Sequence, residues 1–151
     1  MKYYSTNKKS PKVSLEQAVI QGLASDKGLF MPEEIPSLPA HFFASIDQLS
    51  FQEIAFEVSL AFFGDEIPEN KLKEIVYDTL NFDVPLVRIT SQISALELFH
   101  GPTLAFKDVG ARFMARLLGY FTQRQSVVDE DQNIHVLVAT SGDTGSAVAN
   151  G

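Results

Sequence analysis

The amino-acid sequence predicts an α/β fold in which a helix-rich first part is followed by the start of a parallel β-sheet. Two observations carry this prediction. Residues 1–83 repeat apolar side chains at helical spacing, whereas the rest of the chain contains a helix, a continuous apolar run at 134–139 and a glycine-rich turn that opens another helix. Helix, strand, turn and helix in this order are typical of α/β sheets. We therefore expect two domains, 1–83 and 84–151, of which the second carries an incomplete parallel sheet.

The composition narrows the class of protein. The chain has 151 residues, 45% of them hydrophobic, which is enough to bury a sizeable core. Its net charge of −7 argues against a nucleic-acid partner, which needs clustered Lys and Arg. There is no cysteine and the three histidines are scattered, so we expect no metal site. No run approaches the roughly 18 apolar residues of a membrane span, and the polar N-terminus does not resemble a signal peptide, so we expect no membrane partner and a cytoplasmic location. The sequence makes no prediction of oligomeric state.

Helix signals account for most of the first domain. Two capping boxes, each a serine followed three residues later by Gln or Glu, predict helix starts; they are Ser14 with Gln17 and Ser50 with Glu53. The first helix is expected over about 15–25, ending before Gly28, and the second up to Gly64, which is placed to end it.

A third helix is expected after Pro68, because proline suits the first turn of a helix. Its buried stripe is predicted to consist of Leu72, Ile75, Val76 and Leu80. Between the first two helices, a short apolar stretch at 29–31 leads into a proline-rich segment that we expect to be extended and non-helical; the prolines are Pro32, Pro36 and Pro39.

The second domain begins with two short β-prone runs, 86–89 and 96–99. A helix then follows Lys107 and continues to about Phe121. On this helix Asp108 and Arg112 have the spacing of an i,i+4 ion pair, and Arg116 follows one turn later. Such an arrangement either holds an anion or forms a solvated helix face.

Lys107 is the candidate reactive residue. It stands at a helix N-terminus beside an apolar face made of Phe106, Val109, Phe113, Met114, Leu117 and Leu118. Partial desolvation and the positive end of the helix dipole both favour the neutral amine, and imine formation with an aldehyde cofactor requires that form. The alternative is an ordinary first-turn lysine whose ammonium extends into water.

The second candidate site is the turn formed by Ser141, Gly142, Asp143, Thr144 and Gly145. Its backbone N–H groups, its hydroxyls and the start of the next helix are suited to binding a carboxylate or phosphate at the end of a strand. Its sequence is neither a Walker A motif nor the dinucleotide-binding fingerprint. It also lacks the Gly-x-Ser-x-Gly motif of a nucleophilic serine, and no neighbouring carboxylates or histidines could complete a metal site with Asp143. The alternative is a tight turn that needs glycine conformations and a helix cap.

Taken together, these motifs resemble those of one family. The run Leu96-Glu-Leu-Phe-His-Gly-Pro-Thr-Leu-Ala-Phe-Lys107-Asp108 is similar to the cofactor-lysine motif of threonine synthases, which are pyridoxal-phosphate (PLP) enzymes of the tryptophan-synthase-β fold, or fold type II. Ala139-Thr-Ser-Gly-Asp-Thr-Gly145, which begins 32 residues after the lysine, resembles their next motif. The segments 22–32 and 63–68 resemble the family's dedicated N-terminal domain, so the resemblance spans essentially the whole chain.

The resemblance implies a PLP-dependent lyase that converts O-phospho-L-homoserine and water to L-threonine and phosphate, the last step of threonine biosynthesis. Lys107 would hold PLP as an imine and, once displaced by substrate, would move protons between substrate carbons. The turn from Ser141 to Gly145 would face the substrate carboxylate and the cofactor ring.

Family members continue well beyond the length of this sequence, and their later part contains the loop that binds the cofactor phosphate. We therefore expect the chain to be the N-terminal portion of a threonine synthase and to be inactive alone. Two alternatives remain. One is a threonine-synthase-like phospho-lyase with a different product, and the other is a non-catalytic module that keeps the N-terminal domain for binding or assembly.

Overall fold

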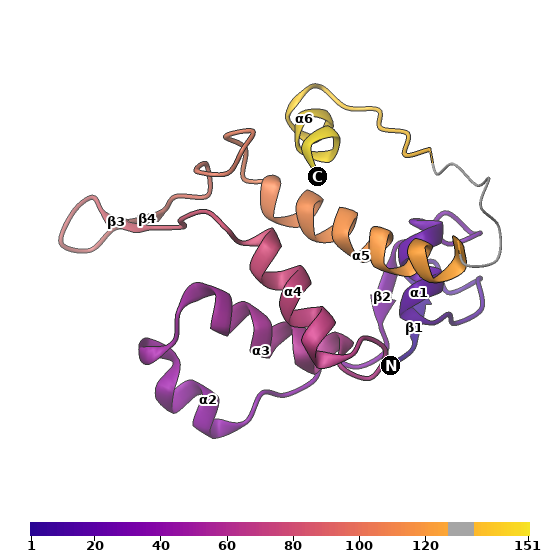
Figure 1. The fold of residues 1–151 in the computed structure, drawn as a ribbon, viewed down its shortest axis with the longest axis horizontal. Helices are drawn as coiled ribbons and strands as arrows, with labels where there is room; N and C mark the ends of the chain where they lie inside the picture. The colour runs from indigo at the N-terminus through magenta and orange to yellow at the C-terminus, as the bar shows by residue number, and fades with distance from the viewer. Residues whose placement is uncertain (127–134) are drawn as a thin grey trace. The chain divides into compact units, whose positions relative to one another are not determined.

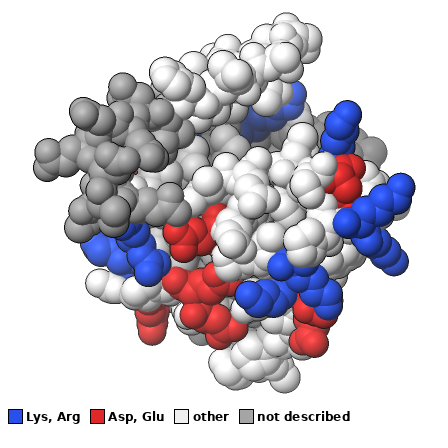
Figure 2. Space-filling model, turned by 90° about the vertical axis from the view of Figure 1, so that its right-hand side faces the viewer, with Lys and Arg blue, Asp and Glu red and all other residues white. Residues whose placement is uncertain are grey.

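The computed structural model describes residues 1–126 and 135–151, which form two compact units, Met1–Tyr77 and Asp78–Gly151. Each unit combines helices with one small two-stranded antiparallel sheet (Figure 1). Within the described residues no helix is both long enough and apolar enough to cross a membrane. Acidic and basic side chains are interspersed on the face shown in Figure 2, which therefore carries no continuous basic surface.

The sheet of the first unit joins β1 (Tyr3–Ser5) to β2 (Phe30–Pro32), with Tyr4 opposite Met31. Neither segment was predicted as a strand, because three residues are too few to show an alternating pattern. Two further backbone hydrogen bonds connect β1 and the residue after it to other segments of the chain. The Tyr3 N–H donates to the Val13 carbonyl and the Thr6 N–H to the Leu29 carbonyl, each at 2.9 Å.

The Asp26 carboxylate fastens the loops around this sheet. One of its oxygens accepts hydrogen bonds from the Ser5 hydroxyl at 2.6 Å and the Gly28 N–H at 3.0 Å, and the other accepts from the N–H groups of Lys9 and Ser10 at 2.9 and 3.0 Å. These donors, the Ser5 hydroxyl foremost, hold the pKa of Asp26 well below its usual range. Gly28 is required here, because a Cβ at this position would lie 2.1 Å from the Ser5 hydroxyl oxygen.

Helix α1 (Leu15–Gln21) begins with the predicted capping box, in which the Ser14 hydroxyl accepts from the Gln17 N–H and the Gln17 side chain accepts from the Ser14 N–H, both at 3.2 Å. The expected end near residue 25 is wrong. Gly22 adopts a φ of 68°, which ends the helix directly after Gln21.

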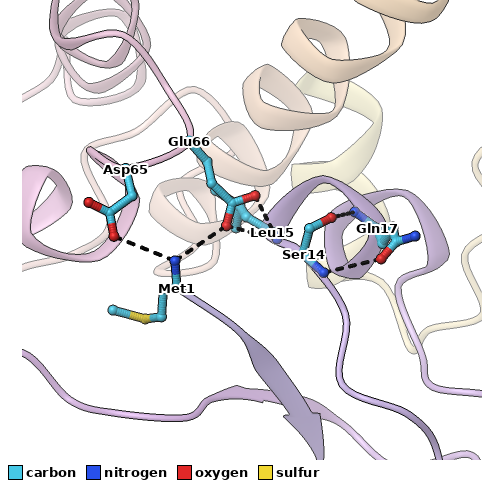
Figure 3. A network of polar contacts seen from close by, with 6 residues as sticks. All are labelled: Met1, Ser14, Leu15, Gln17, Asp65 and Glu66. Carbon is cyan, nitrogen blue, oxygen red and sulfur yellow. Dashed lines mark hydrogen bonds and ion pairs between the residues drawn. The ribbon is translucent and has the colours of Figure 1, made fainter.

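A carboxylate from a distant part of the chain also caps α1, as Figure 3 shows. Both oxygens of Glu66 accept from the Leu15 N–H, at 3.1 and 3.2 Å, although the two residues are 51 positions apart. The ammonium group of Met1 lies 3.8 Å from Glu66 and 3.5 Å from Asp65. Because the first N–H groups of a helix have no intrahelical acceptor, Glu66 both satisfies one of them and ties α1 to the residues after α3.

Three further helices of the first unit are α2 (Ala40–Ser45), the short 3₁₀ helix η1 (Ile46–Gln48) and α3 (Phe51–Phe63). The capping box at Ser50 and the end of α3 before Gly64 are confirmed. The segment after the prolines was expected to be non-helical, but α2 starts immediately after Pro39, which occupies its cap position. On α3, Phe56 is buried whereas Phe51 is exposed.

Helix α4 (Glu69–Thr79) follows Pro68 as predicted, and all four residues of the predicted stripe are buried: Leu72, Ile75, Val76 and Leu80. On the solvent side, the Lys73 ammonium group lies 5.8 Å from the ring centre of Phe56 and 5.4 Å from that of Tyr77, within cation–π range of both. Burial of the apolar stripe is the main interaction that stabilises α4 as a helix.

In the second unit, the end of α4 is followed by a hairpin of β3 (Leu86–Arg88) and β4 (Ser94–Leu96). The first strand matches the predicted run, whereas the second lies earlier than 96–99. The turn explains this shift, because the Thr90 hydroxyl accepts from the Gln92 and Ile93 N–H groups at 3.2 and 3.1 Å and closes the turn before Ser94.

Two helices complete the described part of this unit, α5 (Asp108–Ser126) and α6 (Asp143–Asn150). Both were predicted, although α5 extends beyond Phe121. They pack closely because the contact is lined by small residues. Ala147 is fully buried, and a Cβ at Gly151 would lie 3.1 Å from both the Ala111 carbonyl oxygen and the Ala115 side chain.

The predicted buried strand at 134–139 is not found. Residues 135–139 form no strand and are exposed, Leu137 to 93%, while Ile134 lies outside the described residues. Both sheets formed by the described residues are antiparallel, not parallel as predicted. The reason is that a parallel strand needs neighbouring strands to take its N–H and C=O groups, and the described residues provide none for 135–139.

We predict that Tyr3→Phe stabilises the chain by about 1 kcal/mol, because the buried Tyr3 hydroxyl has no hydrogen-bond partner among the described residues. Burial and the nearby Glu66 charge raise the pKa of Tyr3 from 10.0 to about 12. The hydroxyl is neutral in both states below pH 10, but between pH 10 and about 12 it ionises only in the unfolded chain, which lowers stability.

The advantage of Tyr3→Phe over the parent chain should therefore grow by about 2 kcal/mol between pH 9 and pH 12, measured by urea unfolding. Tyr4→Phe is the matched control, since Tyr4 is only half-buried, and should differ from the parent by less than about 0.5 kcal/mol. Equal effects of the two substitutions would contradict the assignment.

Glu66→Gln should destabilise the chain by about 1–2 kcal/mol, because the Leu15 N–H then loses a charged acceptor. Asp65→Asn is the control, since the Asp65 side chain is 82% exposed and its ion pair with Met1 is expected to contribute less than about 0.5 kcal/mol. Urea midpoints of the two variants should differ clearly; identical midpoints would show that Glu66 does not cap α1.

Candidate functional site

The structure brings together two residues that the sequence analysis placed in separate motifs. Lys107 is the residue immediately before α5, and its Nζ donates a hydrogen bond of 2.5 Å to the Thr144 hydroxyl in the first turn of α6. The two residues are 37 positions apart. The lysine amine and the Ser141–Gly145 turn therefore belong to one site.

The surroundings of Lys107 are less apolar than predicted. Of the residues expected to form an apolar face, Leu117 is buried and Val109, Phe113 and Leu118 are half-buried, but Phe106 and Met114 are exposed. The Lys107 side chain itself is half-buried, with its Nζ 5.7 Å from the centre of the Phe106 ring. The amine thus lies beside an aromatic ring and a hydroxyl, still within reach of a ligand from solvent.

The turn before α6 is open to solvent at Ser141, Gly142 and Asp143, and half-buried at Thr144 and Gly145. Gly142 adopts a φ of 142°, which disfavours any other residue, and no side chain caps the helix after it. A Cβ at Gly145 would lie 2.7 Å from the Thr140 methyl group. The first N–H groups of α6 have no intrahelical acceptor, so this end of the helix is suited to an anionic group.

Sequence reasoning assigned the wrong partner to Asp108. The predicted ion pair with Arg112 is not formed. Asp108 is fully buried, and its carboxylate accepts from the Thr103 N–H at 2.9 Å and from the Thr103 hydroxyl. The position of Asp108 at the start of the helix could have indicated this contact, because aspartate side chains at helix starts often accept hydrogen bonds from nearby backbone N–H groups.

Arg112 and Arg116 of α5 hold the end of α4, so neither of the two alternatives left open by the sequence, an anion site or a solvated helix face, is found. The buried Arg112 guanidinium donates to the carbonyls of Thr79 and Asp78, at 3.1 and 2.7 Å, and to the Asn81 side chain at 3.2 Å. Arg116 forms an ion pair with the Asp78 carboxylate. The last carbonyls of a helix have no intrahelical donor, and a guanidinium group supplies several.

His100 is also engaged. Its Nε2 lies 2.7 Å from the Glu97 carboxylate, and its ring stacks on Phe99 with centres 4.7 Å apart. Among the residues that the structure describes, no group of three His, Cys, Asp or Glu side chains is placed to hold a metal ion. The site is thus built from one primary amine, hydroxyl groups and backbone N–H groups.

Comparison with known proteins identifies the class to which this chain belongs. Residues 2–80 match the family model described as the N terminus of threonine synthase. Over 99% of its length the chain is 41% identical to a threonine synthase from Escherichia coli and 45% identical to one from Schizosaccharomyces pombe. This sequence belongs to the threonine synthase family.

Solved structures agree with this result. The structure of threonine synthase from Escherichia coli matches 99% of the chain with a TM-score of 0.88 and 41% identity. A PLP-bound threonine synthase from Brucella melitensis matches it with a TM-score of 0.89 and 36% identity. The chain spans about a third of the length of these relatives, 33% and 32% respectively.

We predict that Arg112→Lys destabilises the chain by about 2–3 kcal/mol, because lysine cannot reach three separate acceptors and leaves buried carbonyls unpaired. The control is Arg124→Lys on the same helix, whose exposed side chain contacts the Tyr120 ring at 5.6 Å. It should change the free energy of unfolding by less than about 0.5 kcal/mol in urea. Similar losses in both variants would show that the contacts with α4 are unimportant.

Proposed function

We propose that this chain is the N-terminal third of a threonine synthase that converts O-phospho-L-homoserine and water to L-threonine and phosphate with PLP. The observation that carries the proposal is the 2.5 Å hydrogen bond between the Lys107 amine and the Thr144 hydroxyl, which unites the two motifs resembling the family's site. The domain division follows, with 1–83 as the N-terminal domain and 84–151 as the start of the catalytic domain. The match of residues 2–80 to the family model supports this division.

The residues present fit PLP chemically. Lys107 offers a half-buried primary amine for the aldehyde carbon, beside the hydroxyl of Thr144. The start of α6 offers uncommitted N–H groups for an anionic substituent of cofactor or substrate. PLP, when bound, supplies an electron sink for charge that develops on substrate carbon. The description of the Brucella melitensis relative as PLP-bound supports this assignment.

In this proposal each side chain of the site has a separate task. The Lys107 amine binds the cofactor and, when free, accepts and returns protons at Nζ. Thr144 keeps Nζ at the first turn of α6 through its hydroxyl, so that the proton is exchanged at one place. The backbone from Ser141 to Gly145 binds the substrate carboxylate at the start of α6.

The exposed residues 135–139 have a place in the same proposal. Val136, Leu137 and Val138 are β-branched or apolar and exposed. We assign them to a strand of the parallel sheet in a complete catalytic domain, whose neighbouring strands belong to the part of the relatives that this chain does not match. The complete enzyme would act in the cytoplasm.

The proposal is tested by incubating the purified chain with PLP, reducing with borohydride and mapping the modified lysines by mass spectrometry. A stable adduct should form on Lys107 and be lost in Lys107→Arg. Lys71, about half-exposed and paired with Glu74, is the internal control for non-specific modification. Labelling of Lys107 no greater than that of Lys71 would overturn the assignment and favour a non-catalytic binding module.

A second measurement concerns turnover. The chain alone should release no phosphate from O-phospho-L-homoserine, because the relatives are about three times as long and we assign the remaining contacts of the site to that additional length. Phosphate release would contradict this. Analysis of the product formed by a longer chain that contains this sequence would separate threonine synthase from a related phospho-lyase with a different product.

A further inference from the structure

We propose that Thr103 and Asp108 form a latch that positions the Lys107 amine. The latch consists of the Asp108 carboxylate together with the N–H and hydroxyl of Thr103. The role given to Lys107 rests on the proposed function, but the latch is argued from the geometry of the loop alone. Both residues are positioning residues, since neither is assigned a contact with substrate or cofactor.

Burial makes the latch a strong constraint. Asp108 is 0% exposed, and the two hydrogen bonds that its carboxylate accepts from described residues come from Thr103, five residues earlier. A carboxylate without water must be paired with donors, so breaking this contact leaves a buried charge uncompensated. The residues from Thr103 to Asp108 are consequently closed into a ring, with Lys107 next to the point of closure.

Two backbone features show that the loop is shaped around this closure. A Cβ at Gly101 would lie 2.5 Å from the Asp108 carboxylate oxygen and 2.8 Å from its Cβ, so only glycine lets the chain pass there. Inside the ring, Leu104 has a φ of 59°, a left-handed conformation that is unfavourable for a non-glycine residue. Its side chain is 73% exposed and contributes little packing that would compensate. The ring therefore maintains a conformation that the chain would not adopt freely.

The latch fixes the direction in which the Lys107 side chain leaves the backbone. The Asp108 N–H donates to the Ala105 carbonyl at 3.0 Å, and the Ala111 N–H donates to the Lys107 carbonyl at 2.9 Å. Because the backbone is held on both sides of Lys107, its side chain has fewer conformations to sample before Nζ reaches the Thr144 hydroxyl. A lysine side chain loses rotational entropy when its Nζ is held in place, and a fixed backbone at its base lowers this loss.

A simpler explanation is that Asp108 only complements the dipole of α5. The two explanations differ at Thr103. A charge–dipole interaction survives when the Thr103 hydroxyl is removed, whereas the latch loses one of its two hydrogen bonds. The test therefore centres on Thr103→Val, which removes the hydroxyl and keeps the shape, and on Thr103→Ser, which restores it.

The chain also offers a matched control. Thr79 is 1% exposed, and its hydroxyl has no hydrogen-bond partner among the described residues. Thr79→Val makes the same chemical change at a buried position outside the latch. Far-ultraviolet circular dichroism and urea unfolding of all variants, including Asp108→Asn, verify that each is folded under the conditions of the assay.

The first readout is the rate at which PLP modifies Lys107, trapped by borohydride. We expect Thr103→Val and Asp108→Asn to lower this rate about tenfold, in the range that loss of alignment produces. Thr103→Ser should return to within about twofold of the parent, and Thr79→Val should match it. If the serine and valine variants are equally impaired, or if both equal the parent, the latch is refuted. If the valine variant is poorly folded, Asp108→Asn decides, and a rate equal to that of the parent refutes the latch.

The second readout needs no cofactor. A short pulse of acetic anhydride, with Lys71 as internal reference, should acetylate Lys107 about fivefold faster in Thr103→Val than in the parent, because the hydrogen bond to Thr144 is weakened. An unchanged ratio would overturn the latch. If the parent forms no PLP adduct but this ratio changes as expected, the proposed function fails and the latch stands.

Discussion

The buried carboxylate of Asp108 is the constraint on which the second unit depends most. It lies at the first residue of α5 without access to water, and its hydrogen bonds come from the loop before the helix. One turn later, the buried guanidinium of Arg112 takes up the carbonyls at the end of α4. Two buried charges four residues apart thus bind two different neighbours instead of each other. The start of α5 is held to a loop on one side and to a helix end on the other, and Lys107 is adjacent to this junction.

The first unit uses acidic side chains for the same purpose. Asp26 accepts hydrogen bonds from three backbone N–H groups and one hydroxyl, and Glu66 caps a helix from 51 residues away. Strands of three residues provide few ladder hydrogen bonds, so the N–H groups of loops and helix ends need other acceptors. Carboxylates are suited to this, because one group accepts several hydrogen bonds and each is charge-assisted. The same hydrogen bonds lower the pKa of Asp26, because they stabilise its charged form.

Several features set by neighbours in sequence were predicted, although the end of α1 at Gly22 and helix α2 were not, and features set by distant partners were missed. The capping boxes at Ser14 and Ser50 and the buried stripe of α4 are local patterns, and they are confirmed. The strands β1 and β2 depend on each other across more than twenty residues and have no recognisable pattern alone. The i,i+4 spacing also led to a wrong pairing of Asp108 with Arg112. The i,i+4 rule applies to exposed helix faces, whereas both of these residues are buried. At the site, the sequence identified Lys107 and Thr144 as candidates, but their contact depends on how α6 packs on α5.

That packing explains how a short helix can place a hydroxyl accurately. At its C-terminal end α6 is followed by Gly151, where any Cβ would approach Ala111 and Ala115 at 3.1 Å, and Ala147 is fully buried in between. At its N-terminal end Thr144 accepts the hydrogen bond from Lys107. Both ends of α6 therefore meet the beginning of α5, and small side chains set the separation of the two helices. A larger residue in this contact would move the hydroxyl away from Nζ without touching either residue of the pair, because a displacement of about 1 Å is enough to break such a hydrogen bond. The alanines and glycine of this contact are thus as much a part of the site as the groups that carry its chemistry.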